Sequence, residues 1–236
     1  GRVSNAGADD VSIHQGWSGD EYHLSVEGSV REAMAFGEKM RMTRTISTML
    51  GAKWFELHDR IENLGFEKQP LMMLYHSNFG FPLLGPKTRI IAPVLSSEPL
   101  TEDARKALPL WNRCEEPRLG CDEKVFSHTL RGDSNGDTFV CLWNEDTGDG
   151  TPLGLVMRFN LKELPGLLEW KLMRKGFYVL GIEPCTVVPT GRENLRAKGI
   201  LPYLMPFEYY NITIRYEVIE TAQEKDALEA SAKSLL

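Results

Sequence analysis

The chain has 236 residues, of which 42% are hydrophobic and 25% are charged. This composition is typical of a globular protein and excludes a disordered chain. Its 33 acidic and 27 basic residues give a formal net charge of −6. An acidic balance disfavours binding to nucleic acid or to an anionic membrane surface, because both partners favour basic proteins. The chain contains no run of 18 apolar residues, so it predicts no transmembrane helix, and its polar first residues predict no signal peptide.

Strand-like segments dominate the chain. They alternate polar and apolar residues, which is the period of a strand with one buried face. In chain order these segments are residues 21–26, 41–46, 54–61, 138–143, 153–159, 177–182 and 209–219. Clusters of Gly, Asn and Asp at 133–137 and 146–150 predict turns between antiparallel strands.

Helical signal is limited to two segments. Residues 101–110 predict one or two turns, and residues 221–236 are rich in Ala, Glu and Lys. Strands do not alternate with long helices, which disfavours a doubly wound α/β fold. We therefore predict an all-β protein with few helices: one large antiparallel β-sandwich domain over residues 1–220, followed by a C-terminal helical tail at 221–236.

Cofactor chemistry has no support in the sequence. The four cysteines, Cys114, Cys121, Cys141 and Cys185, form no C-x-x-C pair and lack the spacing of a zinc site. Free thiols in a reducing, cytoplasmic compartment are expected. The phosphate-binding, dinucleotide-binding, zincin and hydrolase motifs are all absent. We expect no metal and no cofactor.

The segment at residues 71–82 places a histidine next to an apolar run. It reads Leu-Met-Met-Leu-Tyr-His-Ser-Asn-Phe-Gly-Phe-Pro. A buried strand is predicted to run into His76, whose imidazole would then reach a cavity at the strand end. The alternative is that His76 is held there by hydrogen bonds that serve only the fold.

The segment at residues 178–186 places a carboxylate after an apolar run. Glu183 follows mostly apolar residues and precedes Pro184. A buried carboxylate is costly unless it is paired or used, and burial raises its pKa towards the range of a general base. The alternative is that Glu183 is paired with Arg192 or Arg196.

Several segments together resemble a known family. Residues 1–5, 75–82 and 181–184 resemble the aldose 1-epimerase (galactose mutarotase-like) superfamily, and more closely its DUF4432 branch of predicted sugar epimerases. The pieces at 59–65, 123–126, 189–192 and 199–202 support the likeness, which extends from residue 1 to about residue 219. In this resemblance, strands that normally precede residue 1 are missing.

The resemblance implies cofactor-free interconversion of the α and β anomers of a monosaccharide or sugar derivative. Glu183 would take the proton from the C1 hydroxyl as the base, and His76 would protonate the ring oxygen as the acid. The ring then opens and closes again with the other face presented. We expect the two side chains to flank a gap the size of a pyranose, beyond hydrogen-bond contact.

The resemblance and the neighbouring positions also suggest groups that hold the sugar. Glu123 matches an acidic position of the family. Arg2, Asn78 and Lys171 lie near the motifs and could hydrogen-bond sugar hydroxyls, while Arg2 could equally be a solvated end residue. Trp170 could stack on the apolar face of the ring or simply pack in the core.

Two other functions remain open on the same scaffold. One is a carbohydrate-binding sandwich without turnover. The other is a different sugar epimerase or a lyase, because a fold does not determine a function. The sequence does not identify the sugar or the oligomeric state.

Overall fold

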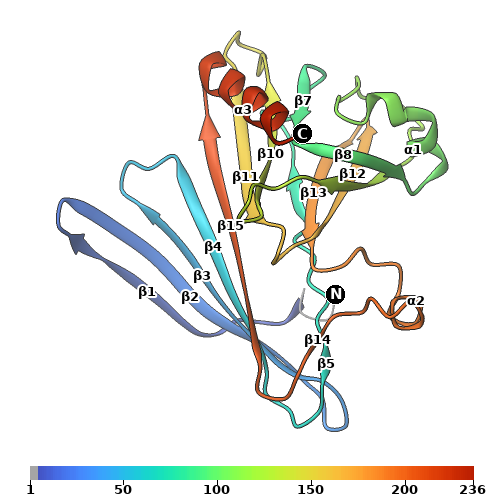
Figure 1. Ribbon diagram of the computed structural model, residues 1–236. Coiled ribbons are helices and arrows are strands. Elements are labelled where there is room, and N and C mark those ends of the chain that lie inside the picture. Colours follow the sequence, from blue (N-terminus) through green and yellow to red (C-terminus); the bar gives the residue numbers. More distant parts are fainter. Residues whose placement is uncertain (1–4) are drawn as a thin grey trace. The chain divides into compact units, whose positions relative to one another are not determined.

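The computed structural model describes residues 5–236 and divides the chain into two compact units. The first unit consists of Gly1–Met72 and Thr190–Tyr216, and the second of Met73–Pro189 and Glu217–Leu236. Figure 1 shows the elements of each unit, which are described separately here.

The first unit is built on long antiparallel strands. Its sheet has the order β1 (Asp9–Ser18), β2 (Glu21–Ala33), β3 (Lys39–Met49), β4 (Trp54–Asn63) and β15 (Tyr209–Ile219), whose last three residues belong to the second unit. A small sheet pairs β5 (Gln69–Pro70) with β14 (Tyr203–Leu204), and α2 (Arg192–Ala197) is a short helix.

The predicted alternation is visible in the register of this sheet. Ile13, Val26, Ile46 and Leu57 pair across four strands and form one apolar row. The neighbouring row, one residue away on each strand, is polar: His14, Ser25, Ser47 and Glu56. Adjacent residues of a strand point to opposite faces, so this pattern gives the sheet one apolar and one polar face.

The second unit contains a five-stranded antiparallel sheet. Its order is β6 (Ser77–Phe79), β13 (Phe177–Cys185), β12 (Gly166–Arg174), β9 (Lys124–Leu130) and β8 (Val94–Pro99). Three further strands pair in the order β7 (Thr88–Ile91), β10 (Asp137–Asn144) and β11 (Leu153–Asn160). The unit also holds α1 (Glu102–Ala107) and α3 (Ala222–Leu235).

The core of the second unit lies on one face of the five-stranded sheet. Phe126, Leu180 and Ile182 point to this face and are almost fully buried. Strand β10 is buried on both faces. On one of them, Phe139 and Trp143 pack in a cluster that includes Leu228 of α3. The predicted C-terminal helix is therefore present, and it buries Leu228 and Ala232 in this cluster.

The structure confirms the all-β class and most of the predicted strands, and it corrects one of them. The expected strand leading into His76 is absent: residues 71–76 hold one isolated bridge, between Leu74 and Cys185, and His76 comes just before β6. The helix expected at 101–110 is confirmed as α1 followed by a 3₁₀ turn at Leu108–Leu110, and Thr101 caps α1. The helix α2 was not predicted, and eight strands lie outside the predicted segments: β1, β5, β6, β7, β8, β9, β12 and β14.

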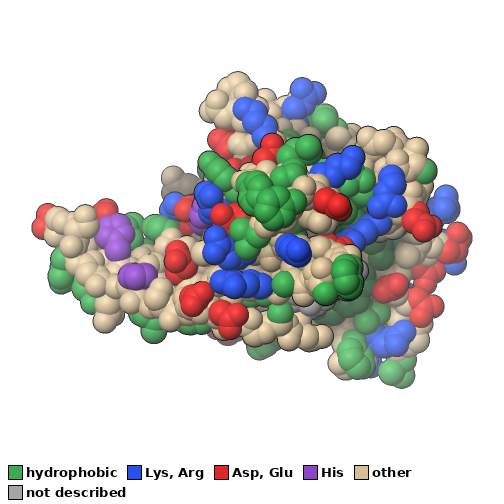
Figure 2. Space-filling view, turned by 90° about the horizontal axis from the view of Figure 1, so that it is seen from below, with side chains coloured by type: hydrophobic (Ala, Val, Ile, Leu, Met, Phe, Trp, Pro, Cys, Tyr) green, Lys and Arg blue, Asp and Glu red, His purple; other side chains and the backbone are tan. Residues whose placement is uncertain are grey.

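Other expectations concern thiols, surface charge and membrane spans. All four cysteines are free, as predicted. On the face in Figure 2, acidic and basic side chains are interspersed. Among residues 5–236, no helix has the length and apolar character needed to span a membrane. The same residues hold no group of three or more His, Cys, Asp or Glu side chains placed to bind a metal ion.

Candidate functional site

One face of the five-stranded sheet collects most of the predicted site residues. In the register of this sheet, Gly181 of β13 is opposite both Trp170 of β12 and Asn78 of β6. Residues directly opposite each other in a sheet share a face, and so do residues two apart on one strand. Glu183 therefore lies on the same face as Trp170 and Asn78.

Glu183 and His76 are in direct contact on this face. His76 Nε2 lies 3.0 Å from Glu183 Oε1. The Glu183 side chain is 6% exposed, whereas the His76 side chain is 45% exposed. The expected gap between the two groups is therefore wrong for this structure. The two residues are 107 positions apart in the sequence, and the pairing of β6 with β13 brings them together.

The Glu183 carboxyl has a pKa that its surroundings change. Burial raises the pKa of Glu183 above its usual value, because desolvation disfavours the charged form, and the positive charge of a protonated His76 opposes this shift. Within the described part of the chain, Glu183 Oε1 has no hydrogen bond of good geometry, although His76 is close. A buried carboxylate oxygen in this state is a ready acceptor for a hydroxyl donor.

Trp170 and Glu123 extend the arrangement beyond the pair. The Trp170 ring meets the His76 ring edge to face, with centroids 5.7 Å apart. Its indole Nε1 donates a hydrogen bond of 2.8 Å to Glu123 Oε2. Trp170 is partly exposed, so part of its ring is open to solvent. Glu123 is exposed, and its Oε2 is the oxygen that accepts this hydrogen bond.

Gly181 leaves space beneath these side chains. A Cβ at this position would lie 2.6 Å from Glu183 Oε1, 3.2 Å from His76 Cε1 and 3.4 Å from Trp170 Cβ. At the first of these distances something must shift, and the atom met is the end of the Glu183 side chain. A side chain at position 181 would therefore displace the Glu183 carboxylate from its present place.

Lys171 does not belong to this arrangement. It follows Trp170 directly in β12, and strand alternation turns it to the opposite face, where it is 2% exposed. Its ammonium group is 2.9 Å from Glu169 Oε1 and donates hydrogen bonds to the backbone carbonyls of Leu110, Trp111 and Arg113. The prediction that Lys171 could hydrogen-bond sugar hydroxyls therefore does not agree with its buried position.

Two other predictions concern arginines. Arg2 lies outside the described residues. The two arginines considered as partners of Glu183 have partners within their own unit: Arg192 pairs with Glu38 at 2.7 Å, and Arg196 donates a hydrogen bond to the Tyr203 hydroxyl.

A buried chain of polar groups lies on the opposite face of the sheet and was missed in the sequence. His128 Nδ1 is 2.8 Å from Ser97 Oγ, and His128 Nε2 is 2.8 Å from Glu169 Oε2. Glu169 then contacts Lys171. The sequence signal was the alternation of β12, which places residues 169 and 171 together and away from Trp170.

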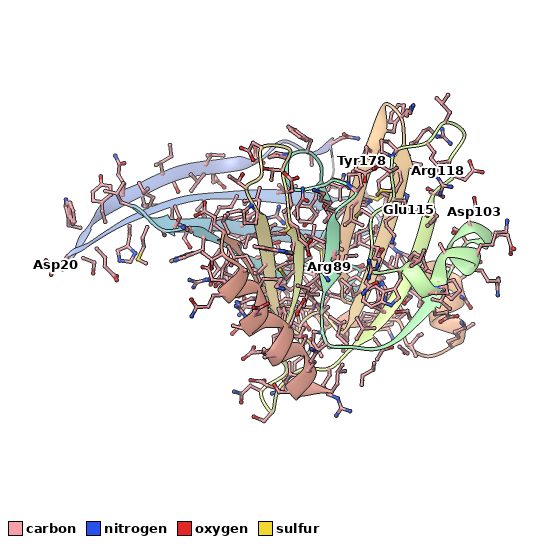
Figure 3. The ribbon with its side chains drawn as sticks, turned by 90° about the horizontal axis from the view of Figure 1, so that it is seen from above. Asp20, Arg89, Asp103, Glu115, Arg118 and Tyr178 are labelled. Carbon is pink, nitrogen blue, oxygen red and sulfur yellow. The ribbon has the colours of Figure 1, made fainter. Side chains whose placement is uncertain are left out.

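The loop that Lys171 holds is anchored at further points. Glu115 in this loop accepts a hydrogen bond from the nearly buried Lys124 and pairs with Arg118 at 3.2 Å. The Tyr178 hydroxyl of β13 donates to the Glu115 backbone carbonyl at 2.7 Å. Figure 3 labels Glu115, Arg118 and Tyr178 in this part of the molecule.

Solved structures show which fold this chain shares. A protein titled "putative aldose 1-epimerase" from Klebsiella pneumoniae subsp. pneumoniae is 26% identical, with a TM-score of 0.92, over 100% of this chain and 60% of that chain. The chain thus spans less than two thirds of that protein's length. A galactose mutarotase-like protein from Clostridium acetobutylicum is 19% identical, with a TM-score of 0.57, over 89% of this chain and 67% of that chain.

A third structure and two sequence comparisons complete these findings. Galactose 1-epimerase from Lactobacillus acidophilus NCFM is 12% identical, with a TM-score of 0.55, over 90% of this chain and 67% of that chain. The search of curated proteins gave no match. The profile of the family described as "Domain of unknown function (DUF4432)" matches residues 1–218. The chain therefore belongs to the DUF4432 family and has the galactose mutarotase-like fold.

Proposed function

We propose that this protein is a cofactor-independent sugar mutarotase of the aldose 1-epimerase type. Glu183 acts as the general base and His76 as the general acid on a monosaccharide or a sugar derivative. The observation that carries the proposal is the contact of a buried carboxylate, whose pKa is raised, with a half-exposed imidazole. The fold shared with proteins named as aldose 1-epimerases supports the same reaction class.

The direct contact of the pair is compatible with the reaction. The C1 hydroxyl oxygen and the ring oxygen are both bonded to C1, so the two reacting atoms are close neighbours. An acid and a base side by side can therefore reach them without a gap as wide as the ring. Entry of the C1 hydroxyl displaces His76 from Glu183 Oε1, which then accepts a hydrogen bond from the substrate.

The reaction neither gains nor loses protons overall. Glu183 takes the proton of the C1 hydroxyl, the bond from C1 to the ring oxygen breaks, and His76 delivers a proton to that oxygen. The open-chain aldehyde rotates about the C1–C2 bond. Ring closure reverses both transfers, so the enzyme ends in its starting state and no cofactor is consumed.

Neighbouring side chains would bind the sugar. Trp170 offers a partly exposed aromatic face to the apolar side of a pyranose. Glu123 holds the indole through one oxygen and has its second oxygen available for a sugar hydroxyl. Asn78 is exposed on the same face and adds a donor and an acceptor.

The test follows the equilibration of freshly dissolved single anomers by polarimetry or proton NMR. Glu183→Gln and His76→Asn are each expected to slow the catalysed rate by about 10²–10⁴-fold, the usual contribution of one proton-transfer group. Glu102→Gln and His23→Asn, at exposed positions far from the pair in the sequence, are the matched controls and should retain the wild-type rate.

Two outcomes would reject the proposal. If the wild-type protein accelerates equilibration and neither site variant slows it, the assignment of roles is wrong. If the wild-type protein binds sugars in a thermal-shift panel but accelerates no interconversion, the function is carbohydrate binding without turnover.

A further inference from the structure

The strongest unexplained feature of the site is the close approach of three side chains over a glycine. Gly181 lies in the middle of β13, between Trp170 on one neighbouring strand and Asn78 on the other. Its backbone conformation is not one that requires glycine, since no positive φ is recorded there. Glycine in a strand interior weakens the strand, so its presence indicates that something approaches the backbone closely.

The approaching groups are the two proposed proton carriers. The volume of an added Cβ would overlap Glu183 Oε1, at 2.6 Å, and would press on His76 Cε1, at 3.2 Å. Both groups already have close neighbours. The Glu183 side chain is 6% exposed, and the His76 ring lies against both Glu183 Oε1 and the Trp170 ring.

We infer that Gly181 is a positioning residue that sets the contact between Glu183 and His76, because this contact occupies the space of any other residue's Cβ. The inference rests on the proposed function for its catalytic meaning. The effect of Gly181 on the contact between Glu183 and His76 does not depend on the proposed function, since that contact exists whether or not a sugar is turned over.

The first experiment measures the pair without any sugar. The imidazole signals of His76 are recorded by proton–nitrogen NMR at one fixed pH and identified by their loss in His76→Asn. Glu183→Gln removes the carboxylate beside the ring and should move these signals. Gly181→Ala should move them in the same direction, because the added methyl group pushes the carboxylate away from the ring.

The control is Gly80→Ala. An added Cβ at Gly80 meets no atom within 4 Å, and Gly80 follows β6 close to the site. This variant should give the wild-type His76 signals. The inference is overturned if Gly181→Ala also leaves these signals unchanged, or if Glu183→Gln itself has no effect on them, because the contact would then be absent in solution.

A second experiment covers the case in which Gly181→Ala is too unstable for NMR. Glu183→Asp shortens the side chain by one methylene and withdraws the oxygen from the added methyl group. The urea midpoint of Gly181→Ala/Glu183→Asp should therefore exceed the value expected from adding the two single losses. Additive losses would overturn the inference, because the clash would not involve the carboxylate.

The kinetic experiment links Gly181 to turnover. If the proposed reaction is found, Gly181→Ala should lower kcat by about 10²-fold, a loss typical of a small misplacement of reacting groups, with little change in KM. In the His76→Asn background the same substitution should cost much less, because both act on one contact. A full loss in both backgrounds would refute the role. Absence of turnover would reject the proposed function alone, since the NMR result would still decide the place of Gly181.

Discussion

Replacing Lys171 with Met tests whether this residue serves the fold or the sugar site. The Lys171 ammonium is 2% exposed and pairs with Glu169, whose side chain is 1% exposed. It also donates hydrogen bonds to three backbone carbonyls in residues 110–113. Met keeps most of the apolar volume but supplies no donor, so the substitution leaves the Glu169 carboxylate and these carbonyls short of a partner.

The expected loss of stability is large. Removing one partner of a buried ion pair costs about 3–5 kcal/mol, because the remaining charge stays desolvated. Folded domains have about 5–15 kcal/mol of total stability, so the variant loses a substantial part of it. With a urea m-value of about 2–3 kcal/mol per M, the unfolding midpoint should fall by about 1–2.5 M.

The assay is urea unfolding followed by tryptophan fluorescence, with Lys106→Met as the matched control. Lys106 pairs with Asp103 on α1, but its side chain is 67% exposed. Exposed pairs contribute about 0–1 kcal/mol, so this control should unfold close to the wild-type midpoint. Adding Glu169→Gln to Lys171→Met should recover part of the loss, because it removes the unpaired charge.

The refuting result is specific. A Lys171→Met protein that unfolds within about 1 kcal/mol of the wild type would show that the buried pair is not important for folding. If that protein also had a raised KM for a sugar, the original placement of Lys171 at the sugar site would be restored.

Three further predictions concern the ionisation of Glu183, the N-terminal cap of α3 and the four cysteines. Burial raises the pKa of Glu183, so its ionisation opposes folding; stability should fall as pH rises from about 4.5 through the raised pKa, and Glu183→Gln should flatten this fall in denaturation curves measured between pH 4 and 8. A flat wild-type profile identical to that of the variant would contradict the shift. Thr221 and Glu224 form a capping box at the start of α3, so Thr221→Ala should cost about 1 kcal/mol in thermal unfolding, and an unchanged Tm would show that the cap is unimportant. Burial raises the pKa of the Cys114, Cys141 and Cys185 thiols to about 12, so at pH 8 a thiol reagent should modify the partly exposed Cys121 first and all four cysteines only in denaturant; rapid reaction of several thiols in the folded protein would be the opposite result.

The all-β class was predictable from local pattern. Alternation with period two in segments such as 21–26 and 41–46 requires only the preferences of neighbouring residues, and the structure places both in long strands. The capped helices at Thr101 and Thr221 were predictable for the same reason, because the capping groups lie within three residues.

The strand register was not predictable from these patterns, and the site depends on it. The sequence drew attention to His76 and Glu183, but it placed His76 after a strand that does not form and expected a gap where there is a 3.0 Å contact. The pairing of β6 with β13 determines that contact, and pairing between distant segments is a property of the whole sheet.

The sequence by itself determined an all-β chain of the DUF4432 family and named the two groups that meet at the site. Tertiary structure alone decided which neighbours join them. Trp170 and Lys171 are adjacent in the chain, yet the pleat of β12 turns one towards Glu183 and buries the other with Glu169. The space above Gly181 likewise became visible only when three strands were set side by side, because close approach between distant residues leaves no trace in local composition.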